Sequence, residues 1–319
     1  MNSNFLKNTL CLGGLCTFSL QMFAAPFHPA DISANPAWVL HLDCDALRPT
    51  TIGQYILSEM DKPEAKAKLA AFQTIFNFDL RNQLHGATLY GSSPASDDGV
   101  LIIYADFDPA RITTLAQATK DYQSSQHGPT IIHNWIDEKK EAKDGVKPRI
   151  YAAIQGNRII FGQREDRVAQ ALDVLSGSSP NLSASKLFSE LGVSGAKHFL
   201  EAAARKMKLP DSDPNAAILK LSQTVQLVMG ESQQQFSGDF TLVADNDELA
   251  GNVLSIAQGL VSLAKFQNDK PESAKIANAI TFTKNSDRVA GNLALPASEV
   301  VEMMKADAAR KAAAKAAKE

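Results

Sequence analysis

The sequence contains few cysteines, and this limits how the fold can be held together. Of the three cysteines among 319 residues, Cys11 and Cys16 lie in an N-terminal segment typical of a secretory signal, and Cys44 lies beyond it. A mature chain with one thiol can form neither an internal disulfide nor a zinc site built from several thiolates. We therefore predict a disulfide-free fold that depends on its hydrophobic core.

Excess charge and long apolar runs are also absent. The chain has 32 Lys and Arg against 35 Asp and Glu, which gives a formal net charge of -3. Because the chain has no net positive charge to attract a polyanion, we expect no nucleic-acid partner. Beyond the N-terminal segment no stretch approaches the roughly 18 uninterrupted apolar residues of a membrane span. We therefore expect no transmembrane segment after signal cleavage, and the partners remain unknown.

The first 24 residues are typical of a secretory signal peptide. Lys7 is their only charged residue, residues 9–23 are mostly apolar or small, and Ala24 and Ala25 follow. Cleavage after Ala24 or after Ala25 fits the pattern, although a proline would follow the second cut. We therefore predict an exported protein, periplasmic or extracellular, in which residues 25–36 form a leader.

Hydropathy patterns predict an α+β fold. Residues 37–43 alternate as a strand, with Trp38, Leu40 and Leu42 on one face and His41 and Asp43 on the other. The other predicted elements are helices over 51–60 and 63–76, strands over 85–91 and 99–106, a helix over 109–122, strands over 130–137, 149–154 and 158–162, a helix over 165–175, a strand over 196–203 whose alanines also permit a helix, a helix over 214–221, strands over 223–230 and 236–245, a helix over 248–266, strands over 280–283 and 288–295, and a helix that begins at 298–304.

The order of these elements indicates an internal duplication. Strand, helix, strand pair, helix, strand pair and helix occur in residues 37–176 and again in 186–305, separated by a linker over 177–185. Consecutive hairpins give antiparallel sheets, so we expect two similar halves, each an antiparallel sheet of hairpins with helices packed on one face. Hairpin–helix units are common enough that chance recurrence is the alternative. Residues 306–319 are predicted to form a charged, Ala/Lys-rich helical tail.

An Asp-x-Asp motif recurs where a predicted strand leads into a helix. It occurs as Asp43-Cys44-Asp45, Asp106-Phe107-Asp108 and Asp245-Asn246-Asp247. Aspartate accepts hydrogen bonds from the free N–H groups of a first helical turn, so we interpret these residues as helix caps. The alternative is a cation site, because closely spaced carboxylates suit calcium or magnesium.

The sharpest candidate for chemistry is the group His41, Asp43 and Asp45, in which an imidazole and two carboxylates could hold a metal or exchange protons. No His-x-x-His or Glu-x-x-His pattern supplies a further ligand. The thiol of Cys44 lies between two carboxylates, which should raise its pKa and disfavour a nucleophile. We therefore predict no catalytic residue, no cofactor and no metal. The other histidines of the predicted halves stand singly and are His85, His127, His133 and His198.

The segment from Pro36 to Leu47, Pro-Ala-Trp-Val-Leu-His-Leu-Asp-Cys-Asp-Ala-Leu, follows the signal and precedes Thr51-Ile52-Gly53. It resembles the start of a group of exported, uncharacterised bacterial proteins, whose second halves are similar to residues 248–261 here. The resemblance implies export and the duplicated layout. It implies no activity and assigns no catalytic residue.

These patterns favour an exported, non-enzymatic binding or scaffold protein of unknown ligand. The chain has no Gly-x-Ser-x-Gly motif, no phosphate-binding Gly-x-x-x-x-Gly-Lys-Ser/Thr run and no Gly-x-Gly-x-x-Gly fingerprint. One alternative is a cation-dependent hydrolase that uses the Asp-x-Asp joints. The other is a carrier of an apolar ligand in a cavity between sheet and helices, lined by residues such as Phe72, Phe76, Leu260 and Phe266.

Overall fold

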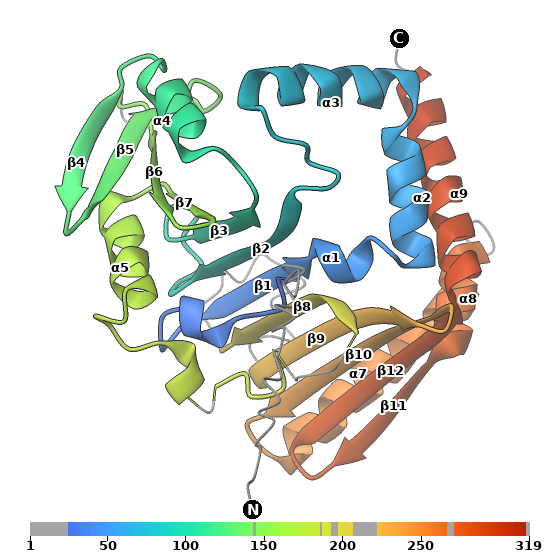
Figure 1. Cartoon of the computed structure of the whole chain (residues 1–319). Coiled ribbons are helices and arrows are strands. Elements are labelled where there is room, and N and C mark those ends of the chain that lie inside the picture. Colours follow the sequence, from blue (N-terminus) through green and yellow to red (C-terminus); the bar gives the residue numbers. More distant parts are fainter. Residues whose placement is uncertain are drawn as a thin grey trace, which may run out of the picture.

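The computed structural model describes residues 25–142, 145–185, 187–192, 197–206, 222–266 and 271–316. These residues build one antiparallel, 12-stranded sheet with the order β11-β12-β10-β9-β8-β1-β2-β3-β7-β6-β5-β4 (Figure 1). The strands are β1 (Trp38–Asp43), β2 (Leu84–Gly91), β3 (Val100–Ala105), β4 (Gln123–His127), β5 (Thr130–Ile136), β6 (Arg149–Gln155), β7 (Arg158–Gly162), β8 (His198–Arg205), β9 (Ser222–Ser232), β10 (Gln235–Ala244), β11 (Ile280–Asn285) and β12 (Arg288–Pro296).

Helices connect and cover these strands. They are α1 (Cys44–Leu47), α2 (Thr51–Met60), α3 (Pro63–Phe76), α4 (Pro109–Gln117), α5 (Glu165–Leu175), α7 (Asp247–Lys265), α8 (Pro271–Ala279) and α9 (Ala297–Ala316), with short 3-10 turns η1 (Pro29–Asp31) and η2 (Leu182–Ala184). Most follow the predicted ranges, and α9 runs on into the predicted tail. The predicted helix over 214–221 lies outside the described residues.

The α+β class is confirmed, but the prediction of a separate sheet in each half is wrong. β1 and β8 pair in antiparallel register, with Trp38 opposite Ala204 and Leu42 opposite Leu200. Each strand would otherwise present a row of unpaired backbone groups, and pairing satisfies both rows at once. The strand order is β1-β2-β3-β7-β6-β5-β4 on one side of this junction and β8-β9-β10-β12-β11 on the other. The duplication itself stays a prediction.

Helices lie on both faces of the first half, where one covered face was predicted. We call the sheet face that bears Leu101 and Phe161 the α4 face, because these two residues stand opposite each other in β3 and β7 on the side where α4 lies. The opposite face, bearing Ile102 and Ile160, is the α5 face. Successive residues of β3 and β7 are apolar, so both faces of the sheet in this half carry apolar side chains that must be covered from solvent.

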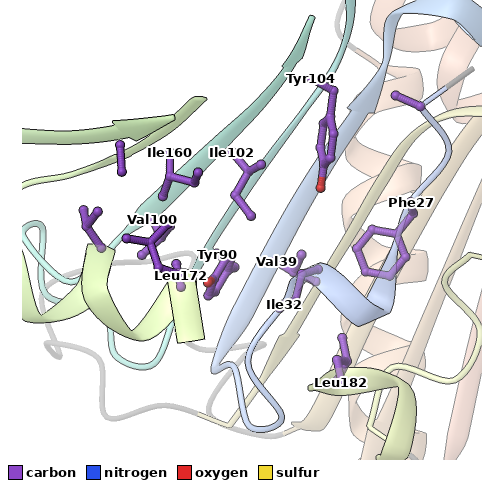
Figure 2. Close-up of a cluster of buried hydrophobic side chains, with 14 of the residues drawn as sticks. Phe27, Ile32, Val39, Tyr90, Val100, Ile102, Tyr104, Ile160, Leu172 and Leu182 are labelled. Atoms are coloured by element: carbon purple, nitrogen blue, oxygen red, sulfur yellow. The ribbon is translucent and has the colours of Figure 1, made fainter. Parts of the chain in front are cut away.

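The main core lies between α5 and the sheet. Figure 2 shows Val39, Tyr90, Ile102 and Ile160 on the α5 face, with Leu172 of α5 packed against the strands. Burying side chains of this size contributes about 1.5–3 kcal/mol each relative to exposure, which makes this cluster the main source of stability in the first half.

The predicted leader and linker are parts of this same core. Phe27 and Ile32 from the leader and Leu182 from the linker are buried in the cluster (Figure 2). The backbone N–H of Leu182 donates to the carbonyl of Ile32 at 2.9 Å. Asp31 accepts hydrogen bonds from the Arg158 guanidinium and from a tyrosine hydroxyl. Both segments therefore pack against the first half of the sheet.

The second half carries its helices on one face, as predicted. Leu249 and Val253 of α7 pack on Leu242 and Val289 of the sheet. The same apolar stripe continues along α7 beyond the sheet, and its later members are exposed. These are Ile256, Leu260, Leu263 and Phe266.

A buried carboxylate ties the two sides of the β1–β8 junction together. Glu231, near the end of β9, accepts hydrogen bonds from the backbone N–H groups of Thr51 at 2.8 Å and Ile52 at 3.1 Å. These groups belong to the first turn of α2, whose free donors and positive dipole end favour an anion. A residue 180 positions away in sequence therefore caps α2.

We expect Glu231→Ala to lower the free energy of unfolding by about 1–3 kcal/mol, because it leaves two donors of a buried helix start without their charged partner. The measurement is equilibrium unfolding in denaturant. Glu302→Ala is the control, since Glu302 forms only an exposed pair with Lys305 and should cost less than about 1 kcal/mol. Equal losses in the two variants would show that the link to α2 contributes nothing.

Candidate functional site

The three Asp-x-Asp joints all supply helix caps. Asp43 Oδ1 accepts from the backbone N–H of Ala46 at 2.8 Å, and Asp108 Oδ1 accepts from Ala110 at 2.9 Å. At the third joint the cap is the middle residue, Asn246, whose Oδ1 accepts from Leu249 at 2.9 Å. One polar side chain at each joint therefore completes the first turn of α1, α4 or α7.

The remaining carboxylates of these joints face basic side chains instead of one another. Asp45 pairs with Arg48 at 2.6 Å and with Nδ1 of His85 at 2.9 Å. Nε2 of His85 lies 3.0 Å from Asp106, so this histidine bridges the first joint and the second. The aspartates at the third joint pair with lysines of neighbouring elements. The role of His85 was not predicted, because its two partners follow the ends of two other strands, β1 and β3.

His41 does not join Asp43 and Asp45 in a shared pocket. Its ring is buried, with Nδ1 2.8 Å from Thr88 Oγ1 and Nε2 3.0 Å from the carbonyl oxygen of Ala25. Burial lowers the pKa of His41 to about 4, although the Ala25 carbonyl opposes the shift. The imidazole is therefore neutral near pH 7, with its two nitrogens engaged in packing the N-terminal segment onto β1 and β2.

The neighbouring groups are poorly suited to chemistry. Burial raises the pKa of Asp43 to about 6, against the opposing hydrogen bond from Ala46. Burial also raises the pKa of the half-buried Cys44 thiol to about 11, so the thiolate is scarce at neutral pH, as predicted. Within the described part of the chain, no three His, Cys, Asp or Glu side chains gather as metal ligands would.

An apolar recess lies between α4 and the sheet. It has a volume of about 390 Å³. One side of α4 and the end of α3 form its roof, and β5, β6 and β7 form its floor. The apolar lining consists of Phe76, Ile112, Leu115, Ala116, Trp135, Ala152, Ile154, Ile159 and Phe161.

The polar groups of this cavity carry no charge near neutral pH. Among its lining residues His133 is the titratable one, and Tyr122 places its hydroxyl 2.8 Å from Nδ1 of that ring. Burial lowers the pKa of His133 below its ordinary value. Two threonine side chains complete the lining. The cavity can therefore accept an apolar molecule without leaving a buried ion unpaired.

The four residues predicted to line an apolar cavity are not brought together. Phe76 lines the cavity, and Phe72 stacks on it with ring centroids 4.4 Å apart. Leu260 and Phe266 instead lie on α7, where they are 56% and 81% exposed. The prediction is therefore wrong for these two residues, because the later half of α7 extends past the strands that would have covered it.

A second recess continues along the same face of the sheet. It has a volume of about 510 Å³, and its lining includes Trp38, Leu89, Leu101 and Phe161. Phe161 also lines the first cavity, so the two spaces meet at this ring. The turn between β2 and β3 forms one wall of the second recess.

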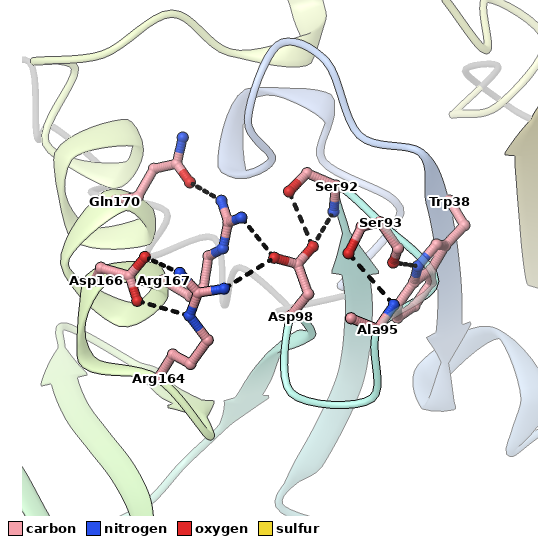
Figure 3. Close-up of polar contacts among 9 residues, drawn as sticks. All are labelled: Trp38, Ser92, Ser93, Ala95, Asp98, Arg164, Asp166, Arg167 and Gln170. Atoms are coloured by element: carbon pink, nitrogen blue, oxygen red, sulfur yellow. Dashed lines mark hydrogen bonds and ion pairs between the residues drawn. The ribbon is translucent and has the colours of Figure 1, made fainter. Parts of the chain in front are cut away.

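A buried ion pair holds this wall in place. Asp98 is 2% exposed, accepts from the backbone N–H and hydroxyl of Ser92 at 2.8 and 2.9 Å, and pairs with Arg167 of α5 at 2.5 Å (Figure 3). Burial alone would raise its pKa, but the Ser92 hydrogen bonds and the Arg167 charge outweigh it and lower the pKa. Trp38 donates its indole N–H to the carbonyl of Ser93 at 2.9 Å, so the turn is fastened on both sides.

We expect stability to fall in acid because of His41. The pKa of His41 lies near 6.5 when the ring is exposed and at about 4 in the fold. Between these values the unfolded chain binds a proton at His41 and the folded chain does not. The stabilising contribution of neutral His41 is fully present above pH 6.5 and is lost as the pH falls towards 4. The loss lowers the free energy of unfolding by about 3 kcal/mol in total. Asp43, with its raised pKa, opposes part of this loss. Denaturation of wild type and His41→Asn across this range measures the difference, and equal acid slopes would contradict the assignment.

No protein-family model and no curated protein matches the chain. Among solved structures, one crystal form of TP0453 is similar at 12% identity, over 89% of this chain and 99% of that chain, with a TM-score of 0.45. A second crystal form is similar at 10% identity over 88% and 98%, with a TM-score of 0.46. A likeness of this degree assigns no function, so the function must be argued from the residues of the site.

Proposed function

We propose that the chain is an exported, non-enzymatic binding protein whose ligand is apolar and occupies the cavity between α4 and the sheet. The observation that carries the proposal is the cavity itself, about 390 Å³ with a lining that is apolar apart from one histidine and two threonines. Ligand sites of proteins fall in the range of about 300–1,000 Å³ and are lined mainly in this way.

The packing of α4 supports this use. The residues that α4 turns towards the sheet include Ile112, Leu115 and Ala116, and each is only half-buried. Core positions of a well-packed helix are closed to water, as Val168 and Leu172 are in α5. An apolar ligand beneath α4 would remove this exposed surface from water at about 25 cal/mol per Å².

The hydrolase alternative is less well supported. The carboxylates of Asp43 and Asp108 cap helices, and those of Asp45 and Asp106 face His85. A cation placed among them would compete with these contacts. The capping and pairing contacts therefore favour a structural role for the joints.

Export is supported by the way the chain begins after the predicted signal. Ala25 is buried in the core, and its carbonyl oxygen accepts the hydrogen bond from His41. Cleavage after Ala24 keeps both contacts, whereas cleavage after Ala25 removes them. We infer that the first cut is used, and that the shared strand order on the two sides of the β1–β8 junction reflects a duplication.

We expect the protein purified from a bacterial host to begin at Ala25, because this start retains the His41 contact. Intact-mass spectrometry of the periplasmic and secreted fractions checks this. A product that keeps its first 24 residues and stays in the cytoplasm would contradict export.

We expect Ala116→Phe to weaken binding of the uncharged fluorophore N-phenyl-1-naphthylamine by about ten-fold or more, a loss of about 1.4 kcal/mol. The ring would occupy the space beneath α4, and filling a cavity in this way need not lower stability. Fluorescence titration measures the affinity, and thermal unfolding checks that the variant folds.

Ala118→Phe is the matched control, because Ala118 is an exposed residue at the end of the same helix. It should bind the fluorophore as wild type does. If both variants bind like wild type, or if the wild type does not bind, the cavity is not a binding site.

A further inference from the structure

Resting on the proposed function, we infer that the ligand is a single long, unbranched alkyl or acyl chain that lies across the α4 face of the sheet. The argument begins with the two recesses, of about 390 and 510 Å³, which share the ring of Phe161. A molecule confined to the first recess would stay beneath α4. A molecule that uses both must be long enough to pass Phe161.

Strand register arranges the floor of both recesses as one straight row. Directly opposed residues of neighbouring strands lie on the same face. His133 stands opposite Ala152, Ala152 opposite Phe161, and Phe161 opposite Leu101. The row continues from Leu101 to Leu89, which is its last member to line a recess. The floor therefore crosses five strands, β5, β6, β7, β3 and β2.

The length of the row sets the length of the ligand. Neighbouring strands lie about 4.8 Å apart, so four steps cover about 19 Å. From Ala152 to Leu89 the row is apolar, and His133 at its far end is held neutral by burial. A chain of methylene groups suits such a row, because it has no polar group that would lose its hydrogen bonds there.

The two ends of the row differ, which orients the chain. Ala152 is 5% exposed beneath α4, whereas Leu89 at the other end is half-buried in a recess that Ser96 and Asp137 also line. A polar head group keeps its water at the Leu89 end, and the apolar tail lies beneath α4. The partly exposed leucine is then covered by the chain near its head group.

The test is a series of straight-chain fatty acids from octanoic to octadecanoic acid, each used to displace N-phenyl-1-naphthylamine from the wild-type protein. Each added methylene group should tighten binding by about four-fold while it still finds apolar floor. The gain should stop once the extended chain reaches about 19 Å, which falls within this series.

A paired variant separates the two recesses. A Cβ placed on Gly99 would lie 3.7 Å from Trp38 and 3.8 Å from Leu89, so Gly99→Leu puts a side chain into the second recess at ordinary contact distances. This variant should bind the longest acids about ten-fold or more weakly than wild type and bind octanoic acid with unchanged affinity. Gly259→Leu is the control, because a Cβ on Gly259 of α7 would have no neighbour within 4 Å.

The outcomes are distinguishable. A gain that stops at octanoic acid, or tighter binding of a compact sterol than of any straight chain, would overturn the inference and leave the proposed cavity in place. A Gly99→Leu variant that binds all chain lengths like wild type would also overturn it. Failure of the wild type to bind the fluorophore would remove the proposed function and the inference together.

Discussion

The pairing of β1 with β8 is the constraint on which the rest of the structure depends. It joins two sets of hairpins into one sheet, because each strand satisfies the free backbone groups of the other. The junction makes each sheet face continuous across the molecule. It also brings Glu231 of one side to the start of α2 on the other, so that a distant carboxylate completes this helix. The position of α2 and α3, and hence of Phe76 beside the cavity, follows from this contact and from the short loops around it.

The part of the α4 face that α4 leaves uncovered has a geometric cause. Strands β3 and β7 are apolar on both faces, so the first half needs a layer on each side. On the α5 face, α5 and the N-terminal segment supply that layer completely (Figure 2). On the α4 face the layer is α4, whose nine residues make a helix about 13 Å long. The row of floor residues beneath it is about 19 Å long, so α4 cannot cover all of it. Figure 1 shows α2 extending away from the sheet and α3 running back towards α4, so that α3 contributes Phe76, at its end, to the lining of the cavity.

Local features of the fold were predictable because local residues determine them. The bounds of α2, α3 and α5 match the predicted ranges, since Thr50 caps α2 and Pro63 begins α3. β4 was missed because its five residues, Gln-Ser-Ser-Gln-His, are polar and show no alternation. The β1–β8 pairing could not be read from the sequence, because it depends on which strand edges meet. The cavity was anticipated only through Phe76, since unfilled space has no residue type of its own.

The arrangement of polar and apolar groups favours the proposed binding role over a catalytic one. His41 and Asp43 belong to the α5 face of β1, whereas Leu40 belongs to the α4 face. The sheet therefore stands between the group most suited to proton transfer and the space most suited to a ligand. A catalyst needs its titratable groups within hydrogen-bond reach of the bound molecule. Here the cavity contains one histidine, which burial keeps neutral and which Tyr122 contacts, so this surface suits the apolar ligand that we propose.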